Sequence, residues 1–247
     1  MDQISFPQYE LVYNAFSFTI AVMGAATVFF FLSRSQVSPV YRTALTITGI
    51  VTMIAGYHYF RIFQSWEAAF VITNGQIKLS GTKFNDAYRY VDWLLTVPLL
   101  LIELILVMRL PEGETMRKSV KLGLLAALMV VLGYPGEISG DNGTRWMWWG
   151  LAMIPFLIIV YDLFIGLRNS IASQPASARG LVSTARWVVV ISWCFYPVVF
   201  LFPMIGLTGG TAATAVQVGY TVADIVAKAM FGVLIYLIAA RKSLAQS

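Results

Sequence analysis

The sequence predicts an all-α membrane protein, a bundle of seven transmembrane helices with a short extracellular β-hairpin between the second and third helices. Three observations lead to this prediction: the composition, the number of long apolar runs and the placement of the basic residues. Of the 247 residues, 58% are hydrophobic and only 12% are charged, whereas a soluble domain usually carries about 25% charged residues. The mean hydropathy of +0.74 therefore favours a chain embedded in a bilayer.

Seven apolar runs are each long enough to cross the hydrocarbon core as a helix, which takes about 20 residues. In chain order, they lie near residues 9–33, 40–65, 86–109, 118–135, 145–168, 180–205 and 213–240. The breaks between them are rich in turn formers and charges, for example "RLPEGETMRK" and "YPGEISGDNGTR". We therefore expect residues 1–247 to form a single membrane domain.

The connection between the second and third runs differs from the others. Its segment "ITNGQIKLSG" is polar, and Asn74-Gly75 is flanked by residues that favour strands. An Asn-Gly pair in this setting is typical of a two-residue hairpin turn, so we expect the hairpin here, outside the membrane.

The basic residues set the expected orientation. Most of them fall at one set of alternate ends of the runs: Arg34, Arg42, Arg109, Arg117, Lys118, Lys121, Arg168, Arg179, Arg186, Arg241 and Lys242. Lys78, Lys83 and Arg145 lie at the other set of ends. By the positive-inside rule the first set is cytoplasmic. We expect a multi-pass protein of the plasma membrane with its N-terminus outside and its C-terminus in the cytoplasm.

Four ionisable residues lie deep in the apolar runs: Asp92, Glu103, Asp224 and Lys228. A charge at mid-membrane costs roughly 2.5–3.5 kcal/mol, so such residues usually mark a proton or ion path. Asp92 and Glu103 are eleven residues apart, close to three helical turns and about 16 Å of rise, so both face the same way. In "ADIVAK", Asp224 lies one turn before Lys228, which favours an ion pair.

Two interpretations of these residues remain at this point. An ion pair such as Asp224–Lys228 can be purely structural. That account leaves out Glu103, which has no cationic residue one turn away and is expected to stay neutral in an apolar environment. A neutral acid that can lose and regain a proton suits a proton relay.

Together, "RYVDWLLTVPLL", the set Asp92, Thr96 and Glu103, and "ADIVAK" resemble the proton-pumping microbial rhodopsins of the proteorhodopsin and xanthorhodopsin branch. The resemblance covers nearly the whole chain. It implies that Lys228 carries all-trans retinal as a protonated Schiff base. It also implies that Asp92 is the main counterion and proton acceptor, Asp224 the second counterion and Glu103 the proton donor.

The resemblance extends to a network around these carboxylates. Arg89 would organise the outward side, and Thr96 would form a hydrogen bond near Asp92. His58, the only histidine, matches a family histidine that contacts the acceptor, where its change of charge near neutral pH would tune proton affinity. A lone histidine is otherwise commonly a packing residue. Tyr220 lies one turn outward of the second counterion, so we expect a hydrogen bond between them.

The resemblance also predicts the wall of the retinal pocket. Its expected members are Tyr90, Trp93, Leu100, Trp193, Tyr196 and Pro197, with Tyr220 beside them. Leucine at position 100 resembles the green-absorbing type. Ordinary helix packing is the competing explanation for these aromatic residues. The tryptophans near the ends of the spans are expected to be belt or packing residues: Trp66, Trp146, Trp148 and Trp149.

Gly150 suggests a second pigment. In xanthorhodopsin-like proteins a glycine near this position opens a window beside the retinal ring, where a carotenoid antenna can lie. Close helix packing is the alternative, because glycine is common at helix contacts in membranes. We expect a carotenoid at Gly150 only as one of these two possibilities.

The implied function is a light-driven outward proton pump, an ion transporter and not an enzyme. One alternative is a sensory rhodopsin that signals to a membrane transducer, although sensors often lack a carboxylate at the position of Glu103. Another is a seven-helix receptor for a diffusible ligand, which would not need Lys228. The resemblance implies a homo-oligomer, a pentamer or a trimer. We expect no metal site, and no basic stretch is typical of nucleic-acid binding.

Overall fold

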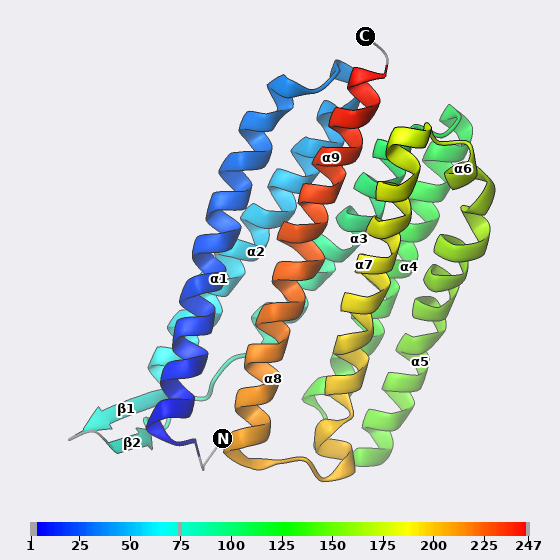
Figure 1. The fold of residues 1–247 in the computed structure, drawn as a ribbon. Coiled ribbons are helices and arrows are strands. Elements are labelled where there is room, and N and C mark those ends of the chain that lie inside the picture. Colours follow the sequence, from blue (N-terminus) through cyan, green and yellow to red (C-terminus); the bar gives the residue numbers. More distant parts are fainter. Residues whose placement is uncertain (1–3, 74–75, 246–247) are drawn as a thin grey trace.

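The computed structural model describes residues 4–73 and 76–245, and within them seven helical rods lie side by side (Figure 1). The rods are α1 (Phe6–Ser33), α2 (Arg42–Ala69), α3 (Ala87–Met108), α4 (Glu112–Ile138), α5 (Asn142–Tyr161), α7 (Ala176–Phe200) and the continuous pair α8 (Gly209–Asp224) and α9 (Phe231–Leu244). π-helical segments extend α5 over Asp162–Gly166 and join α8 to α9 over Ile225–Met230. The remaining helical pieces are α6 (Arg168–Ala172) and 3₁₀ turns at Arg34–Gln36, Pro39–Tyr41 and Phe202–Ile205. The predicted seven-helix bundle is confirmed.

Most rods are longer than the apolar runs that predicted them. The fourth run was expected over 118–135, whereas α4 extends from Glu112 to Ile138, because a helix satisfies its own backbone beyond the most apolar stretch. The sixth run was expected to reach residue 205, but α7 ends at Phe200. Pro203 in the following turn has no N–H to continue the helix, and Gly206 then reverses the chain with φ of 84°.

Six of the rods, counted within the described residues, are long and apolar enough to cross a membrane. The exception is α2, whose threonines and His58 lower its hydropathy. These threonines satisfy their hydroxyls on their own helix, since Thr48 donates to Ala44 O at 3.0 Å and Thr52 to Thr48 O at 3.2 Å. Because α2 packs between α1 and α3, it can be more polar and still belong to the bundle.

The hairpin between α2 and α3 is confirmed. Strands β1 (Phe70–Thr73) and β2 (Gln76–Leu79) are antiparallel, with Phe70 opposite Leu79. The predicted turn residues Asn74 and Gly75 lie outside the described residues. The strands project from one end of the bundle, beside the start of α1 (Figure 1). We call this the hairpin end, and the opposite end, where α9 finishes, the C-terminal end.

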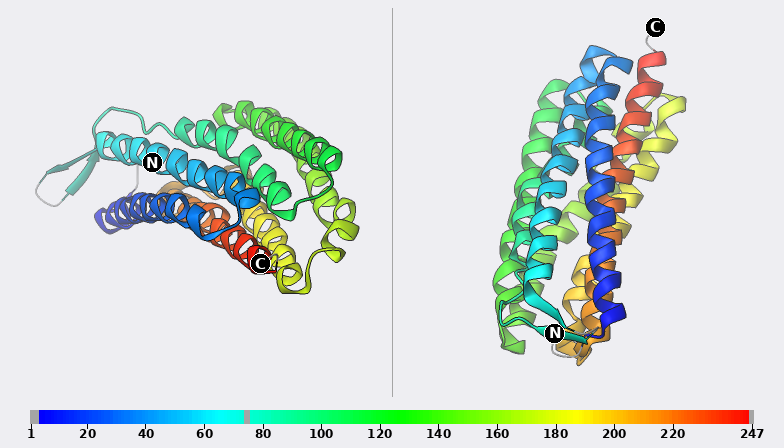
Figure 2. Two further views of the ribbon diagram at one scale, coloured as in Figure 1. Left: turned by 90° about the horizontal axis from the view of Figure 1, so that it is seen from above. Right: turned by 90° about the vertical axis from the view of Figure 1, so that its left-hand side faces the viewer.

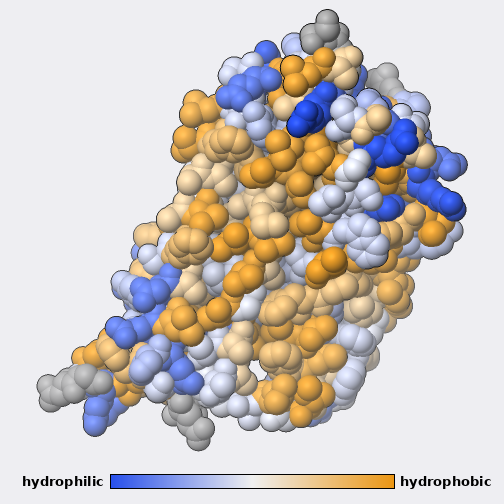
Figure 3. All heavy atoms as spheres, in the orientation of Figure 1, coloured by the Kyte–Doolittle hydropathy of each residue, from blue (hydrophilic) through white to orange (hydrophobic). Residues whose placement is uncertain are grey.

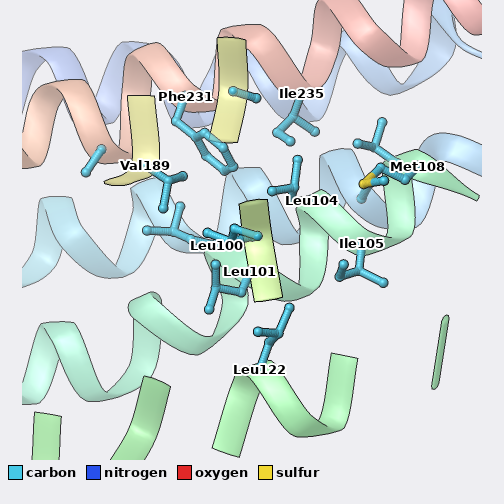
Figure 4. Close-up of a cluster of buried hydrophobic side chains, with 14 of the residues drawn as sticks. Leu100, Leu101, Leu104, Ile105, Met108, Leu122, Val189, Phe231 and Ile235 are labelled. Atoms are coloured by element: carbon cyan, nitrogen blue, oxygen red, sulfur yellow. The ribbon is translucent and has the colours of Figure 1, made fainter. Parts of the chain in front are cut away.

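The rods form a flattened ring. Seen along the bundle, α2, α3 and α4 make one row, while α1, α8 with α9, and α7 make the other, and α5 closes one side (Figure 2). The largest cluster of buried apolar side chains fills the space between the rows. In its C-terminal half, Leu100 and Leu104 of α3 lie between Phe231 and Ile235 of α9 and Leu122 of α4 (Figure 4).

The surface fits a bilayer. Hydrophobic residues cover the middle of the face drawn in Figure 3, and hydrophilic residues gather toward its two ends. Large apolar side chains such as Phe18, Leu32 and Ile191 point outward and are well exposed. At the hairpin end, α5 begins where the Asp141 carboxylate accepts two hydrogen bonds from Thr144, each 2.7 Å long. These bonds lower the pKa of Asp141 below its usual range.

Gly232 allows three rods to approach closely, and this generates a stability prediction. A Cβ atom at Gly232 would lie 2.5 Å from side-chain atoms of both Phe30 and Thr48. We expect Gly232→Ala to lower the free energy of unfolding by about 1–3 kcal/mol, the usual cost of overpacking. The matched control is Gly24→Ala, because a Cβ at Gly24 meets nothing within 4 Å. Thermal unfolding in detergent checks the difference, and equal midpoints for the two variants would contradict it.

Candidate functional site

The centre of the candidate site is the Lys228 amine. Lys228 lies in the π-helical segment between α8 and α9, and its side chain is buried. Its Nζ donates to Asp92 Oδ2 at 2.6 Å and to Asp224 Oδ1 at 2.7 Å. The structure therefore brings together the lysine and two of the carboxylates that the sequence singled out, from two different rods. Three charged groups in an apolar interior are stable only as such a paired cluster.

Asp224 has the richer set of partners. Besides the lysine, Tyr196 OH donates to its Oδ1 and Tyr59 OH to its Oδ2, both at 2.7 Å. The expected hydrogen bond from Tyr220 is not among those that the described residues make with Asp224. Instead, the Tyr220 ring stacks on Tyr196, with centroids 5.7 Å apart and an interplanar angle of 16°. Both oxygens of Asp224 are thus held by donors, which stabilises its ionised form.

Sequence reasoning missed Tyr59. Two tyrosines flank His58 in "GYHYFR", and the pattern does not tell which one faces the interior. In the structure Tyr59 is buried, whereas 57% of Tyr57 is exposed. Tyr59 lies seven residues, about two helical turns, before the buried Trp66 on the same face of α2, so the sequence identifies Tyr59 only when the buried face of α2 is already known.

Asp92 has fewer partners than Asp224. Its Oδ2 accepts from the lysine, while its buried Oδ1 has no hydrogen-bond partner within the described chain. Thr96 Oγ1 donates to the Asp92 main-chain oxygen at 2.8 Å, so Thr96 lies where it was expected. The contact expected between His58 and Asp92 is not among the hydrogen bonds or ion pairs of the described residues, and the His58 ring Nδ1 is bonded to Ile54 O at 3.0 Å. A carbonyl partner requires the proton on Nδ1, which leaves Nε2 as an acceptor in the neutral ring.

Arg89 connects this cluster to the hairpin end. Its Nε pairs with Asp86 Oδ1 at 2.6 Å, and its Nη1 donates to Tyr59 OH at 3.3 Å. Its Nη2 donates to Gln217 Oε1, and its guanidinium lies 5.0 Å from the centroid of the Tyr220 ring. Asp86 is about one-third exposed, so this chain of polar groups reaches from the buried cluster toward solvent. The sequence predicted Arg89 here but gave no role to Asp86 or Gln217.

Glu103 lies on the other side of the cluster, toward the C-terminal end. Its side chain is fully buried, and neither carboxyl oxygen has a hydrogen-bond partner among the described residues. The Thr48 hydroxyl lies beside the carboxyl, but its own proton goes to Ala44 O. An unpaired carboxylate in such a place is costly, so the geometry favours the neutral acid.

An apolar cavity of about 110 Å³ opens directly on the lysine. All six residues predicted as its wall do line it: Tyr90, Trp93, Leu100, Trp193, Tyr196 and Pro197. Trp149, expected as a belt or packing residue, also lines it and donates from Nε1 to Pro197 O at 3.0 Å. Aromatic walls with one buried amine among the lining residues fit a long, conjugated apolar group joined to Lys228.

Gly150 lies on the outer face of α5. It is exposed, and a Cβ built on it would meet nothing within 4 Å. It does not line the cavity itself, but its neighbours Trp149 and Met153 do. The other α5 residues that line the cavity are Ala152 and Phe156, so Gly150 lies on the same helix as four residues of the cavity wall.

Comparisons with known proteins agree with this geometry. The family described as "Bacteriorhodopsin-like protein" matches residues 11–242. The green-light absorbing proteorhodopsin of Gamma-proteobacterium EBAC31A08 is 32% identical over 234 residues, which is 94% of this chain and 88% of that protein.

Solved structures are more similar still. The crystal structure of xanthorhodopsin, described as a light-driven ion pump with dual chromophore, is 51% identical with a TM-score of 0.95, covering 99% of this chain and 98% of that one. The crystal structure of thermophilic rhodopsin is 43% identical with a TM-score of 0.97, covering 100% of this chain and 99% of that one.

The two tyrosines beside His58 provide a test of the site. Tyr59→Phe removes a hydrogen bond to a buried carboxylate, and we expect it to lower the free energy of unfolding by roughly 1.5–3 kcal/mol. Tyr57→Phe is the matched control, because an exposed hydroxyl should change it by less than about 0.5 kcal/mol. Thermal unfolding of both variants measures the difference. Tyr59→Phe behaving like the control would show that the bond to Asp224 contributes nothing.

Proposed function

The chain belongs to the bacteriorhodopsin-like protein family, and from this premise we propose that it is a light-driven outward proton pump with all-trans retinal joined to Lys228. The observation that carries the proposal is the Lys228 amine between two buried carboxylates, at one end of an aromatic cavity. A second observation is Glu103, a buried carboxyl whose oxygens have no hydrogen-bond partner among the described residues. A purely structural ion pair would need neither the cavity nor Glu103.

Retinal bound at Lys228 supplies the absorption of visible light and a light-driven change of shape beside the lysine nitrogen. The carboxylates around that nitrogen determine which group accepts its proton. Asp224 already accepts from Tyr59, Tyr196 and Lys228, so its charge is well stabilised and it is the poorer proton acceptor. Asp92 keeps one oxygen without a partner. Asp92 is therefore the acceptor, and Asp224 remains the ionised counterion.

The direction follows from what lies on each side of Lys228. Toward the hairpin end, Arg89 links Tyr59 to Asp86, and both Arg89 and Gln217 supply polar groups along the way. Toward the C-terminal end, Glu103 can return a proton to the lysine nitrogen. Protons thus move from the C-terminal end to the hairpin end. The concentration of Lys and Arg at the C-terminal end favours a cytoplasmic location for that end, which makes the transport outward.

A carotenoid antenna at Gly150 and a homo-oligomer are finer parts of the proposal. The antenna is supported by the open surface at Gly150 and by the dual chromophore of xanthorhodopsin. The trimer or pentamer rests on the family resemblance alone. The sensory function is the less favoured of the two hypotheses, because a buried acid such as Glu103 has no evident use in signalling.

The proposal predicts light-driven acidification. When cells that make the protein are supplied with retinal and illuminated, the external pH should fall, and a protonophore should abolish the change. Lys228→Ala, the control, should have neither a visible absorption band nor a pH response, because it removes the amine that holds the pigment. If the wild-type protein forms a pigment but leaves the external pH unchanged, the pump is excluded and the sensory alternative gains support.

Glu103→Gln should slow recovery of the dark state after a flash by roughly 100-fold or more, the usual contribution of a positioned acid. Azide, a small proton carrier, should restore part of the rate. The matched control is Glu67→Gln, because Glu67 is exposed at the hairpin end of α2. This variant should recover its dark state at the wild-type rate. Flash photolysis measures both variants, and a normal rate in Glu103→Gln would remove Glu103 from the proton path.

A further inference from the structure

Lys242, near the end of α9, is a second buried lysine with a different environment from Lys228. Only 6% of it is exposed. Its Nζ donates to Val107 O at 3.0 Å, to Met108 O at 2.7 Å and to Gln174 Oε1 at 2.8 Å. All three acceptors are uncharged, whereas a buried lysine is usually paired with a carboxylate. The proposed proton path described above gives this residue no role.

The acceptors explain why an ammonium group is stable there. α3 ends at Met108 because Arg109 adopts the left-handed conformation, with φ of 55°. The last carbonyls of a helix have no partner within it, and they carry the negative end of the helix dipole, which favours a cation. Gln174 binds the same carbonyl as Lys242, since its Nε2 donates to Met108 O at 3.1 Å. We call Lys242, Gln174 and the carbonyls of Val107 and Met108 the Lys242 tie.

The tie joins segments that are far apart in the sequence. It fixes the C-terminal end of α3, which carries Asp92 and Glu103, to the rod that carries Lys228. Gln174, from the segment between α6 and α7, is the third member. Because the hydrogen bonds converge on two adjacent carbonyls, a movement of any one of the three segments at this end must break or strain them.

Glu103 lies one turn below the tie. Val107 follows Glu103 by four residues on α3. The tie therefore binds α3 one helical turn beyond the Glu103 carboxyl, toward the C-terminal end. The residues of the two rods toward the tie form an apolar layer that includes Leu104 and Val107 of α3 and Ile238 and Ala239 of α9, all buried. Glu103 is completely buried, so a proton from the C-terminal end reaches it only when this layer opens.

We propose that Lys242 is a positioning residue for proton uptake: the Lys242 tie keeps the apolar layer over Glu103 closed in the dark, and its release after illumination admits a proton to Glu103. The inference rests on the proposed function, because it gives the tie a place in the pump cycle. Lys242 itself carries no proton in this scheme. It acts by holding α3 against α9, and thereby sets the rate at which Glu103 exchanges protons with solvent.

The first experiment needs no variant. Amide hydrogen exchange of the wild-type, retinal-loaded protein is compared in the dark and under continuous light. The amides of the last turn of α3, from Ile105 to Met108, should exchange faster in light, while those of the first turn of α3, near Arg89, should not. Equal protection of the last turn in dark and light would overturn the proposal, even if the protein pumps protons normally.

The second experiment measures proton uptake with a pH-sensitive dye after a flash. Lys242→Met keeps a long apolar side chain but removes the three hydrogen bonds. We expect uptake to become about tenfold faster, because even one charge-assisted hydrogen bond holds the closed state by about that factor. Lys242→Arg should restore most of the wild-type rate. Arg241→Met is the matched control, since Arg241 is exposed and adjacent; it removes one positive charge but should leave uptake unchanged.

These outcomes separate the inference from the proposed function. If the wild-type protein shows no light-driven pH change, the pump itself fails. If it pumps and Lys242→Met takes up protons at the wild-type rate while melting at a lower temperature, Lys242 is only a structural contact and the inference fails. Should Lys242→Met not fold, the hydrogen-exchange comparison on the wild-type protein still decides the question.

Discussion

The structure depends on one constraint, the cost of a charge inside a low-dielectric bundle. Lys228 meets it by lying within 2.7 Å of two carboxylates at once, and the tyrosines around Asp224 spread the remaining negative charge over several donors. Removing one partner of such a buried cluster leaves an unpaired charge, which is far more destabilising than losing a surface ion pair. Any event that weakens the contact between Lys228 and a carboxylate therefore creates a strong drive for a proton to move. In the dark state the cluster is fully paired, and the free energy of this pairing becomes the driving force for proton transfer when a contact is weakened.

The surroundings of the cluster differ on its two sides: they are polar toward the hairpin end and mostly apolar toward the C-terminal end. On the hairpin side, Arg89, Asp86 and Gln217 form a continuous polar chain that ends at a partly exposed carboxylate. On the C-terminal side, neither carboxyl oxygen of Glu103 has a hydrogen-bond partner among the described residues, and the Thr48 hydroxyl beside the carboxyl donates to Ala44 O. On the hairpin side, protons can therefore pass between the cluster and solvent along polar groups. On the C-terminal side, the apolar residues around Glu103 must first separate. This asymmetry, more than any single residue, gives the proposed transport its direction.

The sequence alone predicted much of this architecture. Long apolar runs identify the spans because the membrane sets their length, and Lys228, Asp92, Asp224 and Glu103 stand out because charges are rare in such runs. Partners whose types are common in membranes were harder to find. Tyr59 was not distinguished from Tyr57, Trp149 was expected as a belt or packing residue, and Gln217 was not noticed, because each role depends on which side of a helix faces a neighbouring rod. Lys242 was read only as a mark of orientation, since nothing in the chain shows that its ammonium reaches the end of another helix.

The π-helical segment at Ile225–Met230 has a consequence for the orientation of the last helix. A π turn accommodates one more residue than an α turn, so it offsets everything after it by roughly 100° of rotation. Asp224 precedes this offset, whereas Lys242 follows it. If all six residues of this segment adopted regular α-helix, α9 would be rotated by about 100° about its axis relative to α8, away from the groups it meets. The extra residue therefore sets the rotation that lets Asp224 and Lys242, on either side of the segment, each reach their partners, and Lys228 lies within the segment itself.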